Sequence, residues 1–337
     1  HESYLEVISR FPILPEPEAF GLHSNADITK DLGQTALLTE TLIKTSGASS
    51  GGAGGVEALV AKITADVLAR LPANFDIEAV QRKFPVKYEE SMNTVLAQEM
   101  LRYNRLLTII RSSLQQLEKA IAGLSVMSAE LETVFDAFAV GQVPALWMEK
   151  SFPSLKPLAS YVEDLLARLD LFDGWYRNGQ PSIFWISGFF FTPSFTTAAL
   201  QNFARGNGYA IDTVGYEMEM LDVDPGKYTS APETGIYVHG LFLEGCAWDA
   251  EKKLLAESRP KVLFEKAPCI WLKPSLLSEM REFPHYACPV YRTAERKGVL
   301  ATTGHSTNFL MMMKMPTTHG EDWWTMRGVC MLCSLSD

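Results

Sequence analysis

The sequence predicts an α+β fold in which an N-terminal antiparallel helical array is followed by a small antiparallel β-barrel. Apolar residues recur at helical spacing from about residue 25 to about residue 176. Beyond residue 208, short β-branched and aromatic runs alternate with Gly and Pro, a spacing that favours a small barrel or sandwich. All five cysteines also lie in the last third of the 337 residues. We therefore expect the two ends of the chain to be built differently.

The helical part is predicted to contain several helices joined by polar and glycine-rich segments. Asn25 can cap a first helix, and residues 45–55, rich in Gly and Ser, are predicted to form a flexible loop. Pro72 ends the next apolar pattern because proline cannot continue a helix. The further predicted helices cover residues 56–71, a short segment after Asp76, 91–124, 128–138 and 158–176.

The most regular of these elements is the helix from about Ser91 to Leu124. Its apolar residues step by four and three positions, as in a coiled-coil seam. The seam consists of Leu96, Met100, Tyr103, Leu107, Ile110, Leu114, Leu117, Ile121 and Leu124. Such a helix would be about 50 Å long at 1.5 Å per residue, which suits packing along something extended. We interpret the seam as the buried face of a helical bundle, with self-association as the alternative.

The pattern changes at Gly179, where turn residues precede a buried strand over residues 182–186. One more helix is predicted over residues 194–204. The strands of the predicted barrel cover residues 211–220, 235–243, 261–264, 269–272, 287–292, 309–315 and 323–333.

The composition excludes two classes of partner. The chain has 30 Lys and Arg against 40 Asp and Glu, and its net charge of −10 has the wrong sign for gripping a phosphate backbone. Its longest apolar run, residues 183–191, is well short of the roughly 20 residues that a membrane helix requires. We therefore expect neither nucleic acid nor a membrane as a partner.

The first residues and the cysteines indicate the setting of the chain. His1 begins a segment with neither a basic nor an apolar leader, and five cysteines cannot all pair within the chain, so we expect a cytosolic protein with reduced thiols. A start without Met, ahead of a proline-rich stretch at residues 11–17, also predicts a piece of a larger protein.

Motifs that carry chemistry are missing from the sequence. It contains no phosphate-binding Gly-x-x-x-x-Gly-Lys-Ser/Thr, no Gly-x-Gly-x-x-Gly, no His-Glu-x-x-His and no Gly-x-Ser-x-Gly. A zinc site is an alternative, because His285, Cys288, Cys330 and Cys333 are suitable ligands, but the thiols lie in apolar runs where cysteine acts as a small hydrophobe. A thiol enzyme using Cys246 is a further alternative. We assign no catalytic residue, no cofactor site and no metal site.

Two features are candidates for an interface. Residues 211–251 hold nine carboxylates against one basic residue, Lys227, so they form either a solvated face or a docking surface for a basic partner. On a strand, Trp323 and Trp324 would point to opposite sides, so one can fill the core and the other can anchor a partner. The candidate interface residues are Asp212, Glu217, Glu219, Asp222, Asp224, Trp323 and Trp324.

Four strings carry a resemblance to a known family. Residues 17–28, 184–192, 237–249 and 303–309 together resemble the C-terminal region of dynein heavy chains, in the order of that family and over nearly the whole chain. Residues 288–291 and 304–308 look more like axonemal than cytoplasmic heavy chains. The glycine tract at residues 47–55 departs from the family and resembles a species-specific insertion.

The resemblance implies a domain organisation. Residues 1–22 would close the small subdomain of the sixth AAA+ module, residues 23–180 would be the helical part of the C-terminal domain, and residues 181–337 its β-barrel part. ATP and Mg²⁺ would be bound by earlier AAA+ modules, so no cofactor is expected in this chain.

It also implies a non-catalytic role in microtubule-based ciliary or flagellar movement. The domain would brace the AAA+ ring of its own heavy chain and tune ATPase coupling, force and processivity. Its partners would be the ring modules and other axonemal dynein-arm subunits, with an adaptor surface for such a subunit as the alternative function. The expected location is the cytoplasm and cytoskeleton, in the axoneme of a cilium or flagellum.

Overall fold

The computed structural model describes residues 2–10, 16–20, 22–46, 53–296 and 307–336. Its helices are α1 (Glu2–Ser9), α2 (Asn25–Ser46), α3 (Ala53–Arg70), α4 (Ile77–Lys83), α5 (Ser91–Ile121), α6 (Ala129–Ala139), α7 (Ala145–Met148), α8 (Leu158–Asn178), α9 (Thr192–Asn207) and α10 (Glu321–Met326), with 3-10 turns η1 (Pro17–Phe20), η2 (Ile186–Gly188), η3 (Ile211–Thr213) and η4 (Pro225–Lys227). The strands are β1 (Ile183–Trp185), β2 (Val214–Met220), β3 (Ile236–His239), β4 (Phe242–Glu244), β5 (Cys246–Asp249), β6 (Leu254–Glu257), β7 (Phe264–Lys266), β8 (Ile270–Leu276), β9 (His285–Tyr291), β10 (Phe309–Pro316) and β11 (Cys330–Leu332).

The predicted flexible loop coincides with the gap between α2 and α3. Residues 47–52 lie outside the described residues, whereas residues 45–46 and 53–55 belong to the two flanking helices.

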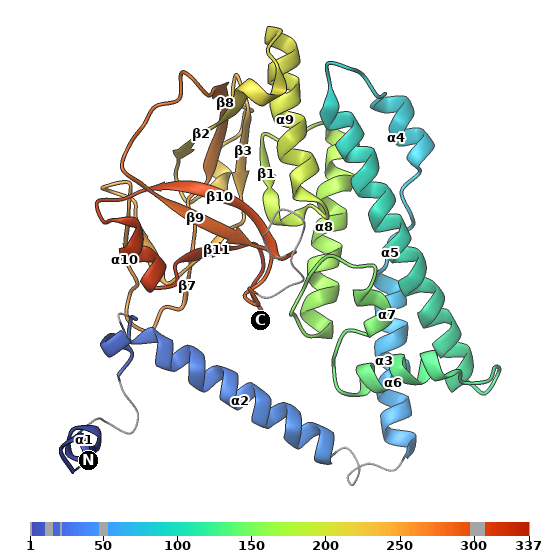
Figure 1. Ribbon diagram of the computed structural model, residues 1–337. Coiled ribbons are helices and arrows are strands. Elements are labelled where there is room, and N and C mark those ends of the chain that lie inside the picture. The colour runs from blue at the N-terminus through green and yellow to red at the C-terminus, as the bar shows by residue number, and fades with distance from the viewer. Residues whose placement is uncertain (1, 11–15, 21, 47–52, 297–306, 337) are drawn as a thin grey trace.

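Helix α5 is the centre of the helical part. It contacts α3, α4, α6, α7, α8 and α9, so most of the helical core is assembled around it (Figure 1). Its 31 residues end at Ile121, three residues before the predicted end, and give a length of about 46 Å. Local signals set the helix ends, since Ser128 caps α6 and Asp76 caps α4 by accepting backbone N–H groups.

The strands form two larger sheets and a hairpin. The first sheet has the order β1-β3-β8-β2, in which β1 and β3 are parallel and the other pairs antiparallel. The second has the order β10-β9-β11-β4-β7, in which β11 and β9 are parallel. The third pairing is the antiparallel hairpin β5-β6. Helix α9 contacts β2 and β8, so it connects the helical core to the first sheet.

The predicted antiparallel β-barrel is therefore wrong. Among the described residues the sheets are open and two of their pairs are parallel. Their edges β2 and β10 come close, but the side chain of Met218 stands between them. The backbone N–H of Lys314 donates to Met218 Sδ at 3.3 Å instead of to a β2 carbonyl, so no backbone ladder joins these two described edges.

The predicted strand over residues 323–333 is also wrong in its first half. Glu321 and Asp322 supply negative charge to the first turn of α10, which favours a helix start, and Gly328 with φ of 64° ends the turn that follows it. Only Cys330–Leu332 pairs as a strand, between β9 and β4.

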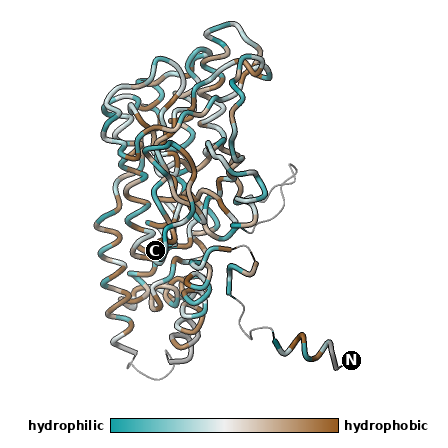
Figure 2. Tube along the Cα trace, turned by 90° about the vertical axis from the view of Figure 1, so that its left-hand side faces the viewer, coloured by the Kyte–Doolittle hydropathy of each residue, from teal (hydrophilic) through white to brown (hydrophobic). Residues whose placement is uncertain are grey.

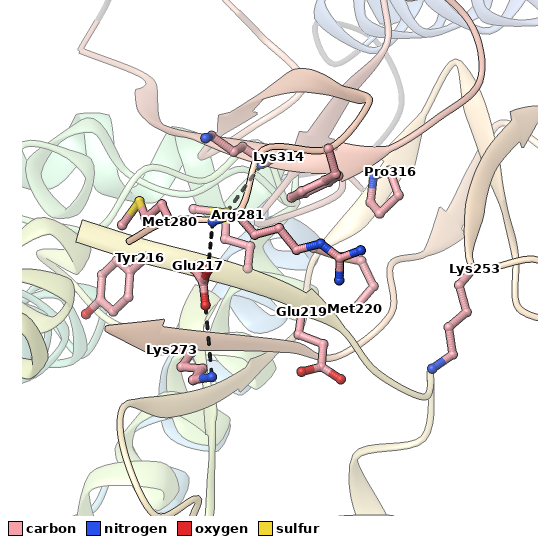
Figure 3. Close-up of a pocket in the computed structure, with 12 residues that line it drawn as sticks. Tyr216, Glu217, Glu219, Met220, Lys253, Lys273, Met280, Arg281, Lys314 and Pro316 are labelled. Carbon is pink, nitrogen blue, oxygen red and sulfur yellow. Dashed lines mark hydrogen bonds and ion pairs between the residues drawn. The ribbon is translucent and has the colours of Figure 1, made fainter. Parts of the chain in front are cut away.

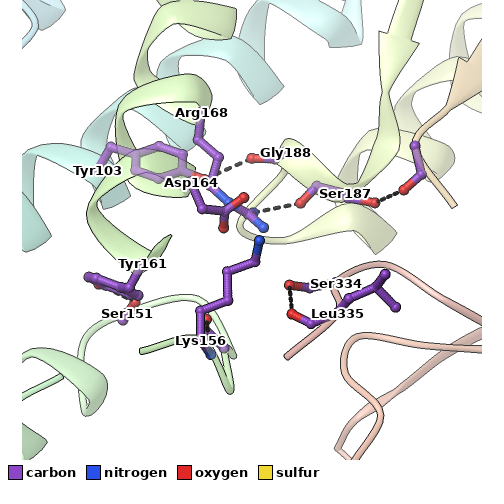
Figure 4. Close-up of polar contacts among 12 residues, drawn as sticks. Tyr103, Ser151, Lys156, Tyr161, Asp164, Arg168, Ser187, Gly188, Ser334 and Leu335 are labelled. Carbon is purple, nitrogen blue, oxygen red and sulfur yellow. Dashed lines mark hydrogen bonds and ion pairs between the residues drawn. The ribbon is translucent and has the colours of Figure 1, made fainter. Parts of the chain in front are cut away.

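The helices hold the sheets through a buried polar cluster, which we call the η2 clamp: Tyr103, Asp164, Arg168 and Ser187 (Figure 4). The 3-10 turn η2 is buried, so its carbonyl groups need donors from elsewhere. Arg168 Nη1 donates to the carbonyl of Ser187 at 2.5 Å, and Tyr103 Oη donates to that of Gly188 at 2.7 Å. The hydroxyl of Ser187 continues to the Gly240 carbonyl at 2.6 Å. One short turn thus connects α5, α8 and the corner between β3 and β4.

Both charges of the clamp are themselves buried. Arg168 pairs with Asp164 at 2.9 Å, and their side chains are only 4% and 10% exposed. The guanidinium also lies over the Phe152 ring, with 3.9 Å from Cζ to the ring centroid. Pairing, hydrogen bonding and ring contact together compensate the cost of removing these charges from water.

A second buried carboxylate fixes the start of α9. Glu99 on α5 is fully buried and accepts the backbone N–H groups of Phe190 and Phe191, the second at 3.1 Å. Arg102 pairs with it at 2.7 Å. Burial raises the pKa of Glu99 above its ordinary value, and these donors act in the opposite direction.

Gly240→Ala should destabilise the chain because this position combines a left-handed backbone with a close neighbour. Its φ is 94°, and an added Cβ would overlap Trp185 Cδ1. Backbone strain alone should lower the free energy of unfolding by about 1–3 kcal/mol, and the overlap with Trp185 adds to this loss. Urea denaturation measures the change. Gly206→Ala in α9 is the control, since its Cβ would meet no atom within 4 Å, and we expect it to be neutral or to stabilise by about 0.5–1 kcal/mol. Equal effects of the two changes would contradict this account.

Arg168→Met should remove the central donor of the η2 clamp and leave Asp164 buried without its partner. We expect the free energy of unfolding, measured by urea denaturation, to fall by about 3–5 kcal/mol. Arg82→Met is the control, because that arginine is 70% exposed and its pair with Glu78 is long, at 3.8 Å; we expect a change below about 0.5 kcal/mol. A loss at Arg168 as small as that of the control would show that the clamp does not hold the two parts together.

Candidate interface sites

The fold divides the five acidic residues of the predicted interface among three places. Asp212 lies exposed in η3, while Glu217 and Glu219 lie on β2. Asp222 and Asp224 follow β2 in a turn, where Asp222 pairs with Lys227 at 2.5 Å and Asp224 accepts the N–H of Gly226 at 2.9 Å. The backbone N–H of Asp224, and then Lys227, lower the pKa of Asp222. These two carboxylates therefore have local structural partners.

The other two carboxylates line a groove of about 690 Å³ that follows β2 (Figure 3). We call it the β2 groove: residues 216–220 form one side, and Lys314 and Pro316 of β10 contribute to another. Its four cationic residues are Lys253, Lys273, Arg281 and Lys314. With only Glu217 and Glu219 opposing them, the groove has a net formal charge of 4 − 2 = +2 in a chain whose net charge is −10.

This charge could not be read along the sequence. Lys273 is opposite Glu217 in the β2–β8 register, and its Nζ is 4.0 Å from Glu217 Oε2. Lys314 and Arg281 come from later segments, and the backbone N–H of Arg281 donates to Glu217 at 3.0 Å. Only the strand pairing places these cations beside the acidic stretch.

The two tryptophans have different surroundings. Trp324 is fully buried, and its indole N–H donates to Thr317 Oγ1 at 2.8 Å. Trp323 is half-buried between the His319 ring, stacked with centroids 4.6 Å apart, and the guanidinium of Arg327, 3.4 Å from the ring centroid. Trp324 thus fills the core, whereas Trp323 belongs to a stack nearer the surface. Their role as interface anchors stays a prediction.

The helical seam lies largely inside the chain. Its members from Leu96 to Leu117 are fully buried on α5, and Ile121 is partly buried. Leu124 follows the end of α5 and is 79% exposed.

The cysteines and histidines show no sign of a reactive arrangement in the described part of the structure. All five cysteines are free and buried. Desolvation raises the pKa of Cys269 and Cys333 to about 11 and that of Cys330 to about 12, and it also raises those of Cys246 and Cys288. Within the described residues, no group of three or more His, Cys, Asp or Glu side chains could hold a metal ion.

Exposed apolar side chains gather on the first two helices. On α1, Tyr4 and Ile8 are 74% and 61% exposed, and Leu5 and Val7 are exposed as well. On α2, Leu32 and Leu38 are 56% and 64% exposed. Figures 1 and 2 show α1 standing apart from the rest of the molecule, with apolar residues along it. Apolar residues exposed together in this way mark an interaction surface.

The N-terminal end of α2 is attached to the sheets. Asn25 donates to the carbonyls of Arg259 and Val262, both at 2.9 Å, and accepts the N–H of Lys261 at 2.7 Å. Helix α2 then extends away from this attachment toward the helical part (Figure 1). None of the described helices is both long enough and apolar enough to span a membrane.

Comparison with known families identifies the family of this chain. The family model for the C-terminal domain of dynein heavy chains matches residues 32–333. The chain belongs to this family. It is 50% identical over 339 residues to dynein axonemal heavy chain 12 of Homo sapiens, covering 100% of this chain and 11% of that relative. It is 47% identical over 340 residues to dynein axonemal heavy chain 3 of Mus musculus, covering 100% of this chain and 8% of that relative.

The resemblance read from the sequence, including its axonemal character, is thereby confirmed. The chain is also 45% identical over 333 residues to dynein axonemal heavy chain 1 of Homo sapiens, covering 98% of this chain and 8% of that relative. It spans about a tenth of the length of these dyneins or less. Its place is with the microtubule cytoskeleton of the ciliary or flagellar axoneme.

Raised thiol pKa values lead to a test of the thiol-enzyme alternative. A raised pKa keeps each thiol protonated as the pH passes through the ordinary range of cysteine, so the nucleophilic thiolate is scarce at about pH 8. We expect Ellman's reagent to react slowly with the native dynein domain and rapidly with all five thiols in denaturant. One thiol that reacts at once in the native protein would support the thiol-enzyme alternative.

Proposed function

We propose that this dynein domain is a non-catalytic structural and regulatory module that docks on the AAA+ ring of its own heavy chain. In this proposal ATP and Mg²⁺ are bound by other modules of the heavy chain. The observation that carries the proposal is the exposed apolar surface of α2, in a chain whose long helices α5 and α8 bury their apolar faces. Membership in the dynein family supports the ring as the partner.

The geometry of α2 suits docking along a larger body. Leu32 and Leu38 lie within about a third of the helix circumference, given 100° per residue, so one partner surface can cover both. Covering each leucine would contribute about 1.5–3 kcal/mol. The Asn25 attachment connects α2 to the sheets, so a force on this helix reaches the second part of the domain.

Docking tunes the motor only if it differs between states of the ring. A module that binds two conformations equally shifts no equilibrium between them, however tightly it binds. We propose that the domain binds one arrangement of the ring modules better than another and so influences ATPase coupling, force and processivity. The long helix α5, packed against α3, α6 and α8, gives the domain the stiffness that this role needs.

Charging the exposed face of α2 tests the proposal in the full-length heavy chain. Leu32→Asp with Leu38→Asp should weaken docking by about 3–6 kcal/mol, because both side chains would have to be buried charged or left in water. We expect lower microtubule gliding velocity at an equal or higher ATPase rate. The matched control is Leu277→Asp with Met326→Asp, which charges two exposed apolar residues of the second part. Unchanged velocity, stall force and ATPase rate in the Leu32 and Leu38 variant would refute docking through α2.

A further inference from the structure

The β2 groove lies along an unpaired strand edge. β2 is the last strand of the first sheet, and among the described strands its only ladder is with β8. Hydrogen bonds from Leu277 N to Thr213 O and from Leu221 N to Cys269 O bracket that ladder. Since hydrogen-bonded and non-hydrogen-bonded pairs alternate in an antiparallel ladder, the backbone groups of Tyr216, Met218 and Met220 point away from β8. An edge of this kind is a template for an added extended segment.

The charges around this edge favour an anionic occupant. Lys253 and Arg281 are exposed, and the Lys273 side chain is 44% exposed with a long ion pair of 4.0 Å to Glu217. Figure 3 shows Lys253 and Lys273 reaching the groove from other strands and turns than Arg281 and Lys314. Cations from four separate segments therefore surround the β2 groove. Glu217 neutralises only part of their charge, so they can attract further carboxylates.

The walls of the groove also offer apolar contact. Met218, Met280 and Phe283 line it and are each partly exposed. Methionine is flexible and fits side chains of varied shape, so Met218 and Met280 suit contact with apolar residues of different sizes. The combination of an extended edge, basic rim and methionine-rich wall suits a segment that alternates acidic and apolar residues.

We propose that the β2 groove binds an extended acidic segment of a partner protein, laid along the free edge of β2. Carboxylates of the segment pair with Lys253, Lys273, Arg281 and Lys314, while its apolar residues contact Met280 and Phe283. The partner thus has the opposite charge to the one that the acidic stretch predicts. This inference does not depend on docking to the ring, because it concerns a different surface and a different chain.

A synthetic peptide provides the test, with the full-length heavy chain as the binding protein. The probe is a fluorescent dodecapeptide of alternating Glu and Val, compared by anisotropy with a Lys and Val peptide of the same length. We expect the acidic peptide to bind, the basic one not to bind, and binding to weaken as salt is added. Preference for the basic peptide, or equal binding of both, would overturn the proposal and favour the acidic stretch as the docking surface.

Charge reversal locates the binding. Lys273→Glu with Arg281→Glu should weaken binding of the acidic peptide by about tenfold or more. Lys119→Glu with Lys150→Glu changes the net charge equally on exposed residues of the helical part, and we expect it to leave binding within about twofold. Equal losses in the two variants would show a general charge effect and refute the site. Lys273→Gln with Arg281→Gln, which introduces no repulsion, should give an intermediate loss if the fold is intact.

Two further measurements separate the claims. A peptide N-methylated at every residue has no N–H group left on either edge and cannot donate to β2, so we expect about tenfold weaker binding; unchanged binding would overturn the edge-paired geometry. The Leu32→Asp with Leu38→Asp variant should bind the acidic peptide as the unsubstituted motor does. Loss of peptide binding in that variant would mean that the groove depends on docking, contrary to the inference.

Discussion

The hydrogen-bond requirement of one buried turn holds this domain together. The η2 turn carries the chain from the first strand into α9 through the interior, where its carbonyl groups have no access to water. Arg168 and Tyr103, from two long helices, supply the donors, and Ser187 extends the network to the corner at Gly240. Helices and sheets therefore cannot separate without leaving polar groups and a paired charge unsatisfied.

The η2 clamp also separates a rigid part of the domain from surfaces that are free to bind partners. Glu99 fixes the start of α9, and α9 covers β2 and β8, so the helical core and the first sheet act as one body. The opposite edge of β2 stays unpaired by the described strands, because the Met218 side chain stands between it and β10. A domain built in this way can offer an apolar helix face to one partner and an open strand edge to another.

These two surfaces are the physical basis of the regulatory role that we propose. The exposed leucines of α2 favour contact with a large apolar surface, which we propose to be the AAA+ ring, whereas the basic groove favours an acidic extended segment. Asn25 attaches α2 to the loop before β7 of the second sheet, whereas the β2 groove follows an edge of the first sheet, so the two surfaces lie on different parts of the domain.

The sequence by itself determined the family, because four strings of residues carry the resemblance. It also determined the order of helices before strands and the buried seam of α5, because periodicity and local caps act within a few residues. It could not determine that the sheets stay open, since closure depends on pairing between edge strands far apart in the sequence, and no ladder joins β2 to β10 among the described residues. It predicted a strand at Trp323 where acidic residues in the first turn favour α10. It also described residues 211–251 as acidic, whereas strand register brings Lys273, Arg281 and Lys314 to Glu217 and makes the groove basic. Charge along a sequence is local, but charge around a groove is a sum over segments that only the tertiary structure brings together.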